Sequence, residues 1–153
     1  MNNYRVNLLK EIGIDVNFVP SDLRAWIVIS KKNKLSEEFI REFQNLVDWA
    51  EISRYQLLSE DFIREFQNRI SWNFISAKQK LSDSFLFEFK DKIIWSWYFS
   101  YQSPSAIILK KFVFKVNITN LDSIHTTNLN SLEIKEIQKL LDVKNSFINK
   151  ETI

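Results

Sequence analysis

The chain has 153 residues but no cysteine, one glycine (Gly13), two prolines (Pro20 and Pro104) and one histidine (His125). Without cysteine, disulfide bonds, thiolate metal ligands and thiol catalysis are excluded together. Because glycine adopts positive φ most readily, a chain with one glycine can form few tight β-turns, which disfavours an all-β fold. A glycine-rich loop that cradles a phosphate is excluded for the same reason.

Groups that could perform catalysis are equally few. His125 would need partners to act as a metal ligand or a general base, and there is no second histidine and no cysteine. Acidic pairs such as Glu37 with Glu38 and Glu60 with Asp61 stand at predicted helix starts, where a negative charge complements the helix dipole. We therefore interpret His125 as a surface residue, and we predict a protein that is not an enzyme and has no cofactor and no metal.

Long apolar runs are also missing. The longest run of apolar and aromatic residues, 93–101, is interrupted by Ser96 and Ser100 and is too short to span a bilayer. The N-terminal residues lack the apolar region of a signal peptide. The formal net charge of +2 is too small to imply a polyanionic partner. We expect a protein that is neither secreted nor transmembrane.

What the sequence does contain is a repeat, which runs from Leu35 to Gln102 with a step of 23 residues. Its clearest markers are Trp49, Trp72 and Trp95. The three copies read LSEEFIREFQNLVDWAEISRYQL, LSEDFIREFQNRISWNFISAKQK and LSDSFLFEFKDKIIWSWYFSYQ. Weaker echoes precede and follow them, including residues 129–143. Tandem units of this length are typical of solenoids, whose terminal repeats diverge.

Each copy predicts two short helices joined by a tight turn, over residues 35–45 and 49–56 in the first copy. Ser36 is a helix N-cap, and Asp48 with Glu51 forms a capping-box pattern. Large apolar side chains recur on one face of each predicted helix. The predicted structural core is Phe39, Phe43, Trp49, Ile52, Phe62, Phe66, Trp72, Ile75, Phe85, Phe89 and Trp95.

One unit has too few apolar side chains to offset the entropy lost when its residues are ordered, so neighbouring units must share a core. The predicted fold is all-α: a short α-solenoid of about four to five helix-turn-helix repeats of 23 residues with degenerate terminal caps. A leucine-rich repeat is disfavoured because the L-x-x-L-x-L strand and the asparagine ladder are missing. We predict a single repeat domain, 1–153, with an N-terminal cap and degenerate repeat in 1–34, three clear repeats in 35–102, and a degenerate repeat, a polar loop and a C-terminal helix in 103–153.

The flanking segments give less uniform signals. Residues 3–12 predict a short helix that stops at Gly13, and residues 14–20 predict an extended segment. Residues 106–118 fit both a helix and a strand, and we expect a helix as far as Phe114. Residues 117–128 predict a polar loop. Asn130 with Glu133 predicts the cap of a final amphipathic helix.

Two exposed positions on the second helix of each unit change identity between copies while the core positions do not. The first carries Glu51, Phe74 and Trp97, and the second carries Tyr55, Lys78 and Tyr101. In a repeat array, such a variable face is where binding specificity is encoded. We interpret these six residues as a candidate partner-binding stripe. The alternative is that the stripe packs against the next unit or the C-terminal helix.

The segment LSEEFIREFQNLVDWAEIS resembles a tandem repeat found in proteins of large DNA viruses, especially giant viruses of amoebae. In that repeat the motif L-S-x-x-F-I-x-x-F-x-x-x-V-x-W-x-x-I-S-x-x-Q recurs. The resemblance covers 35–102, and the third copy departs from it at Phe87 and Phe99. It implies a helical-repeat fold and a viral origin, hence a location in the host-cell cytoplasm or the virion. It assigns no activity and no functional residue.

These observations lead to a non-enzymatic helical-repeat protein that mediates protein–protein interaction. The alternative is a structural component of a virus particle, such as a minor capsid protein. Nucleic-acid binding is a third reading, against which the low net charge and the interleaved acids argue. It would use Lys78, Lys80, Lys90, Lys92, Lys110 and Lys111.

Overall fold

The computed structural model describes residues 3–15, 22–32, 34–115, 124 and 126–151, and all regular structure in these residues is helical. The described residues form ten α-helices, one 3-10 helix and no strand, which confirms the all-α prediction. The chain divides into two compact units, Met1–Phe74 (unit 1) and Ile75–Ile153 (unit 2). The predicted extended segment 14–20 lies outside the described residues from residue 16 onward.

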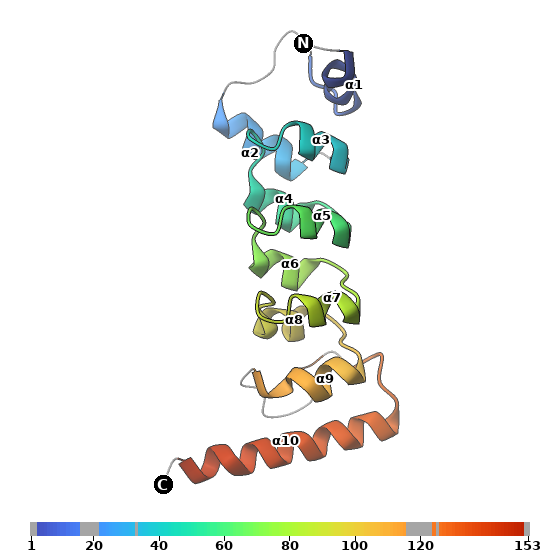
Figure 1. Cartoon of the computed structure of the whole chain (residues 1–153), viewed down its shortest axis with the longest axis vertical. Helices are drawn as coiled ribbons and strands as arrows, with labels where there is room; N and C mark the ends of the chain where they lie inside the picture. Colours follow the sequence, from blue (N-terminus) through green and yellow to red (C-terminus); the bar gives the residue numbers. More distant parts are fainter. Residues whose placement is uncertain (1–2, 16–21, 33, 116–123, 125, 152–153) are drawn as a thin grey trace. The chain divides into compact units, whose positions relative to one another are not determined.

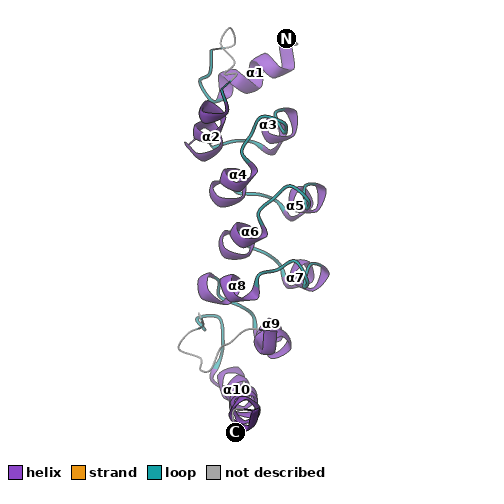
Figure 2. Ribbon diagram, turned by 90° about the vertical axis from the view of Figure 1, so that its left-hand side faces the viewer, coloured by secondary structure: helices purple, strands orange, loops and turns teal. Residues whose placement is uncertain are grey.

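The helices of unit 1 are α1 (Asn3–Glu11), α2 (Leu23–Lys32), α3 (Glu37–Glu42), α4 (Trp49–Tyr55) and α5 (Glu60–Glu65) (Figure 1). The boundary between the units falls within α6 (Trp72–Lys78). Unit 2 continues with α7 (Asp83–Glu88), α8 (Trp95–Tyr101), α9 (Ala106–Phe112), the 3-10 helix η1 (Val113–Lys115) and α10 (Ser131–Glu151). Within unit 1, α2 packs beside α4, and α3 and α5 form the neighbouring column (Figure 2).

Serine hydroxyl groups begin four of these helices, as the repeat predicts. Each hydroxyl oxygen accepts a hydrogen bond from the backbone N–H three residues later, which satisfies a donor that has no partner inside the helix. The donor and acceptor pairs are Phe39 with Ser36, Phe62 with Ser59, Phe85 with Ser82, and Ile108 with Ser105.

The turn after each of these short helices also recurs. The backbone N–H groups of Leu46 and Val47 both donate to the carbonyl of Phe43, at 2.8 and 3.1 Å. The same pair of bonds closes on the carbonyls of Phe66 and Phe89. Gly13 is the only described residue with positive φ, so these turns are built without a left-handed residue.

A second set of hydrogen bonds fixes the following helix. The indole N–H groups of Trp49, Trp72 and Trp95 each donate to the carbonyl five residues earlier, at 3.0, 3.1 and 2.9 Å. The residue just before each tryptophan donates its backbone N–H to a serine hydroxyl 18 residues earlier. These pairs are Asp48 with Ser30, Ser71 with Ser53, and Ile94 with Ser76.

Aromatic rings form the core. In unit 1 the rings of Phe39 and Phe43 lie 4.6 Å apart, with Trp26 5.4 Å from Phe43. One repeat later, Phe62 and Phe66 are again 4.6 Å apart, with Trp49 4.9 Å from Phe66. In unit 2, Phe85 and Phe89 keep the same spacing. Nine of the eleven predicted core residues are buried: Phe39, Phe43, Ile52, Phe62, Phe66, Ile75, Phe85, Phe89 and Trp95.

Trp49 and Trp72 differ from the expectation because they are only half-buried. Each indole turns its N–H to the preceding turn, which places the ring at the rim of the core. The exposed side of Trp49 carries the guanidinium of Arg69, 4.9 Å from the ring centroid, where an apolar neighbour was expected. Truncation of Trp72 should therefore cost less stability than truncation of a fully buried phenylalanine.

The N-terminal helix ends as predicted. The N–H of Gly13 (φ 73°) donates to the carbonyl of Lys10 and the N–H of Ile14 donates to that of Leu9, which is a Schellman motif. Arg5 of α1 forms an ion pair with Glu42 of α3 at 2.7 Å, and its guanidinium lies over the ring of Phe43.

The C-terminal part contains the two helices that the sequence predicts, α9 and α10. Residues 106–112 are helical, as expected, and 113–115 form a 3-10 helix, while 116–118 lie outside the described residues. The echo at 129–143 leads into the predicted final helix, α10, which continues through the rest of the echo without a turn. As expected, Asn130 and Glu133 cap this helix, because each backbone N–H donates to the other residue's side chain. Lys139 and Leu141 stand where the first copy has Asn45 and Val47, and both are stronger helix formers.

Candidate interaction surface

The predicted stripe is exposed at four of its six positions. Tyr55, Lys78, Trp97 and Tyr101 are exposed, whereas Glu51 and Phe74 are half-buried. Phe74 is partly covered because the guanidinium of Arg54 lies 5.3 Å from its ring centroid. Glu51 lies in the first turn of α4, with its backbone N–H bound to the carboxylate of Asp48. The stripe thus falls into separate groups of residues in unit 1 and unit 2.

The unit 1 cluster consists of Lys31, Arg54, Tyr55 and Phe74, from α2, α4 and α6. The Lys31 ammonium and the Arg54 guanidinium lie 5.4 and 5.1 Å from the centroid of the Tyr55 ring. A cation at this distance from an aromatic ring is attracted by the ring quadrupole. Sequence reasoning missed Lys31 and Arg54, which stand one repeat step apart, because the same position carries Ala77 and Ser100 in the next two copies.

The unit 2 cluster consists of Lys78, Trp97 and Tyr101. Trp97 and Tyr101 lie one turn apart on α8, with ring centroids 5.9 Å from each other. The ammonium of Lys78 lies 5.3 Å from the centroid of the Tyr101 ring. Both clusters therefore combine an exposed aromatic side chain with a cation. The repeat position that Trp97 holds in the unit 2 cluster is held by Phe74 in the unit 1 cluster.

A groove of about 360 Å³ adjoins the unit 2 cluster and shares Lys78 and Tyr101 with it. It lies between the ends of α6 and α8 and the residues that precede α10. Its lining residues are Lys78, Lys80, Leu81, Tyr98, Tyr101, Gln102, Ser103 and Asn128. Asn128 enters from a distant part of the chain, and sequence reasoning gave no signal for it.

Tyr98 forms the buried wall of this groove, with 5% of its surface exposed. Burial raises the pKa of Tyr98 to about 12, and the negative charge of Asp83 adds to this effect. The phenol therefore stays protonated throughout the physiological range, so its hydroxyl group remains a hydrogen-bond donor.

The raised pKa of Tyr98 predicts a loss of stability in alkali. The folded state holds the phenol proton to about pH 12, while the unfolded state releases it near pH 10, so the free energy of unfolding should fall as pH rises between these values. A difference of about two pKa units corresponds to about 2–3 kcal/mol. Urea titrations of the wild type and Tyr98→Phe at pH 9 and pH 12 measure this contribution. An identical alkaline loss in both proteins would contradict the assignment, and Tyr101→Phe is the control because its side chain is exposed.

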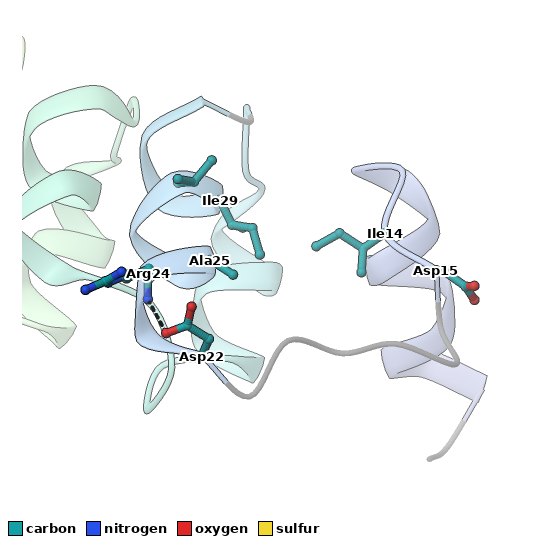
Figure 3. A pocket seen from close by; sticks show the side chains of 7 residues that line it. Ile14, Asp15, Asp22, Arg24, Ala25 and Ile29 are labelled. Carbon is teal, nitrogen blue, oxygen red and sulfur yellow. Dashed lines mark hydrogen bonds between the residues drawn. The ribbon is translucent and has the colours of Figure 1, made fainter.

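Unit 1 contains an apolar hollow of about 550 Å³ (Figure 3). Ile14 points from the end of α1 toward α2, and Ala25, Val28 and Ile29 complete the apolar wall. At its rim, a carboxylate oxygen of Asp22 accepts a hydrogen bond of 3.0 Å from the backbone N–H of Arg24. The segment that joins α1 to α2 lies outside the described residues from 16 to 21.

Among the residues that the structure describes, no three His, Cys, Asp or Glu side chains are grouped so that they could hold a metal ion. His125 itself lies outside them. In the same parts of the chain, none of the helices has the length and apolar character needed to cross a membrane. The resemblance to viral repeats stays a prediction, as no known protein family, no curated protein and no solved structure matches this chain.

Proposed function

We propose that this chain is a non-enzymatic helical-repeat protein that binds another protein through aromatic side chains on the second helix of its repeats. The observation that carries the proposal is the exposure of Trp97 and Tyr101, which are 36% and 57% exposed. Their neighbours on α8 that face the core, Trp95, Tyr98 and Phe99, are buried. Large aromatic side chains held on a rigid helix and open to solvent are typical anchors of protein interfaces.

The arrangement of cations supports a protein partner. Tyrosine, tryptophan and arginine are the residues most enriched among those that dominate binding energy. In unit 1, Arg54 and Tyr55 are neighbours on α4, and the Arg54 guanidinium lies over the Tyr55 ring. In unit 2, the Lys78 ammonium lies over the Tyr101 ring. These contacts restrict the ring orientations before binding, which reduces the entropy lost when a partner docks.

The α-solenoid of 23-residue repeats forms part of the proposal. It is supported by hydrogen bonds that return at the repeat step, namely the serine caps and the tryptophan N–H bonds. It is also supported by the contrast between repeat positions that stay constant and positions that vary. The first helix keeps its phenylalanines at Phe39, Phe62 and Phe85, whereas neither stripe position keeps one residue type through the three copies.

Site-specific photo-cross-linking tests this function. The photoreactive residue p-benzoylphenylalanine replaces Trp97 in one variant and Tyr101 in another, and the full-length chain is irradiated in an extract of its natural source. We expect both variants to give the same discrete cross-linked protein, identified by mass spectrometry. Because the reactive group captures only molecules that contact it, the result reports on the surface and not on abundance.

The matched control carries the same residue at Ile107, which is 61% exposed on α9 and belongs to neither cluster. The control should give no specific product. Equal cross-linking from all three positions, or no product from Trp97 and Tyr101, would refute the proposal that α8 presents a binding surface.

A further inference from the structure

The groove beside the unit 2 cluster offers positive charge on a partly apolar floor. Lys78 and Lys80 stand at the end of α6 and just after it, while Tyr98 and Tyr101 stand on successive turns of α8. Leu81 and the two tyrosine rings supply apolar surface. Among the described residues, no carboxylate lines the groove.

Three polar side chains of the lining, those of Gln102, Ser103 and Asn128, already take part in hydrogen bonds within the protein. The side-chain N–H of Gln102 donates to the carbonyl of Ala77 at 2.6 Å, and that of Asn128 donates to the carbonyl of Ser103 at 3.0 Å. The hydroxyl of Thr127 lies 3.2 Å from that of Ser103. These bonds fix the walls and use one N–H of each side-chain amide internally. The main groups left to meet a ligand are the two ammonium groups and the tyrosine hydroxyls.

Neither lysine of the groove is neutralised by a residue that the structure describes. Lys78 and Lys80 form no ion pair with any described carboxylate, in contrast to Lys110 and Lys115, which pair with Glu136 and Asp91. Asp83 is close enough to influence Tyr98 but does not line the groove, and one of its oxygens accepts a hydrogen bond of 2.7 Å from the hydroxyl of Ser105. The groove therefore presents donors and positive charge, which suits an anion.

We propose that this groove receives an acidic segment of the partner protein, rich in aspartate and glutamate. Its volume of about 360 Å³ lies at the lower end of the range for ligand sites, which is enough for one or two side chains. A carboxylate placed between Lys78 and Lys80 accepts charge-assisted hydrogen bonds from both. The methylene groups of a glutamate pack on Leu81 and Tyr101.

This inference rests on the proposed function and names the chemistry of its partner. An acidic peptide is favoured over a nucleic acid because the positive charge is local. The chain carries 21 basic and 19 acidic side chains, and exposed acids such as Glu88 and Asp91 belong to the same unit. A phosphate backbone would need a longer basic track, since its affinity comes from many such contacts.

Fluorescence anisotropy with a fluorescein-labelled octaglutamate peptide tests the inference on the full chain at low salt. We expect saturable binding that weakens with added salt. The double variant Lys78→Gln and Lys80→Gln should weaken binding about tenfold or more, because both charge-assisted contacts are lost. The control double variant Lys111→Gln and Lys139→Gln removes the same charge from unit 2 at exposed positions outside the groove, and should change binding less than about twofold.

Three results would overturn the inference: no binding of octaglutamate, an equal loss in both double variants, or tighter binding of an oligothymidylate of the same charge. Thermal unfolding of each variant verifies that the fold is unchanged. If cross-linking from Trp97 gives a specific product while octaglutamate does not bind, the proposal of an acidic partner segment is wrong and the proposed protein-binding function stands. If cross-linking itself fails, the function is wrong whatever the peptide does.

Discussion

Replacing Phe62 with alanine is expected to lower the free energy of unfolding by about 3–5 kcal/mol. The Phe62 side chain has no exposed surface, and its ring lies 4.6 Å from that of Phe66 and 6.3 Å from that of Trp49. The guanidinium of Arg41 covers it at 4.9 Å. Truncation leaves a cavity that these neighbours cannot fill, because Phe66 and Trp49 are held by their own turns.

Urea denaturation followed by circular dichroism measures this loss. Leu57→Ala is the control from the same repeat, since Leu57 is 81% exposed and its removal should change stability by less than about 0.5 kcal/mol. A loss of less than about 1 kcal/mol for Phe62→Ala would show that the aromatic core of unit 1 does not determine stability.

Gln56→Met should cost about 2–4 kcal/mol, although it keeps the length of the side chain. Gln56 is 5% exposed and its side chain is hydrogen-bonded to backbone groups that are distant in the sequence. Its Oε1 accepts from the N–H of Leu35 at 2.9 Å, and its Nε2 donates to the carbonyl of Ser30 at 2.8 Å. Methionine can replace neither bond. The N–H of Leu35 and the carbonyl of Ser30 therefore both lose the Gln56 side chain as a hydrogen-bond partner.

The same denaturation assay compares Gln56→Met with Gln138→Met. Gln138 bonds the carboxylate of Asp142 on the surface of α10, where water can replace the lost partner, so its substitution should change stability by less than about 0.5 kcal/mol. Equal stabilities of the two variants would mean that the Gln56 bonds contribute nothing net to folding.

The sequence predicts the core of the repeat well because the core follows from periodicity. Phe39 and Phe43 are one helical turn apart, and both are buried in the structure. Periodicity does not reveal where a helix ends, so the first helix was expected over 35–45 but spans Glu37–Glu42. Beyond Glu42 the apolar spacing continues through a turn that closes on the carbonyl of Phe43.

The repeat also held a signal that apolar periodicity alone misses. Gln56, Gln79 and Gln102 recur at the repeat step, which is unusual for a long polar side chain. Gln56 and Gln79 are buried, and Gln56 and Gln102 both donate to backbone carbonyls far back in the chain. A polar residue that recurs among apolar ones indicates a structural hydrogen bond.

The candidate site was less predictable than the core. Trp97 and Tyr101 could be placed on one face of a helix from their spacing alone. The groove beside them could not be predicted, because Asn128 reaches it from beyond segment 116–123 and no local pattern links the two. The cations over Tyr55 come from different helices, so their meeting depends on tertiary packing.

The turns that close on Phe43, Phe66 and Phe89 have a consequence for the gene. They contain no glycine or proline, and no described residue in them has positive φ. Codons for glycine and proline begin with GG and CC, whereas asparagine, lysine, isoleucine and phenylalanine can be encoded almost entirely by A and T. Because no position of these turns requires glycine or proline, mutation toward A and T removes no residue that their backbone conformation depends on.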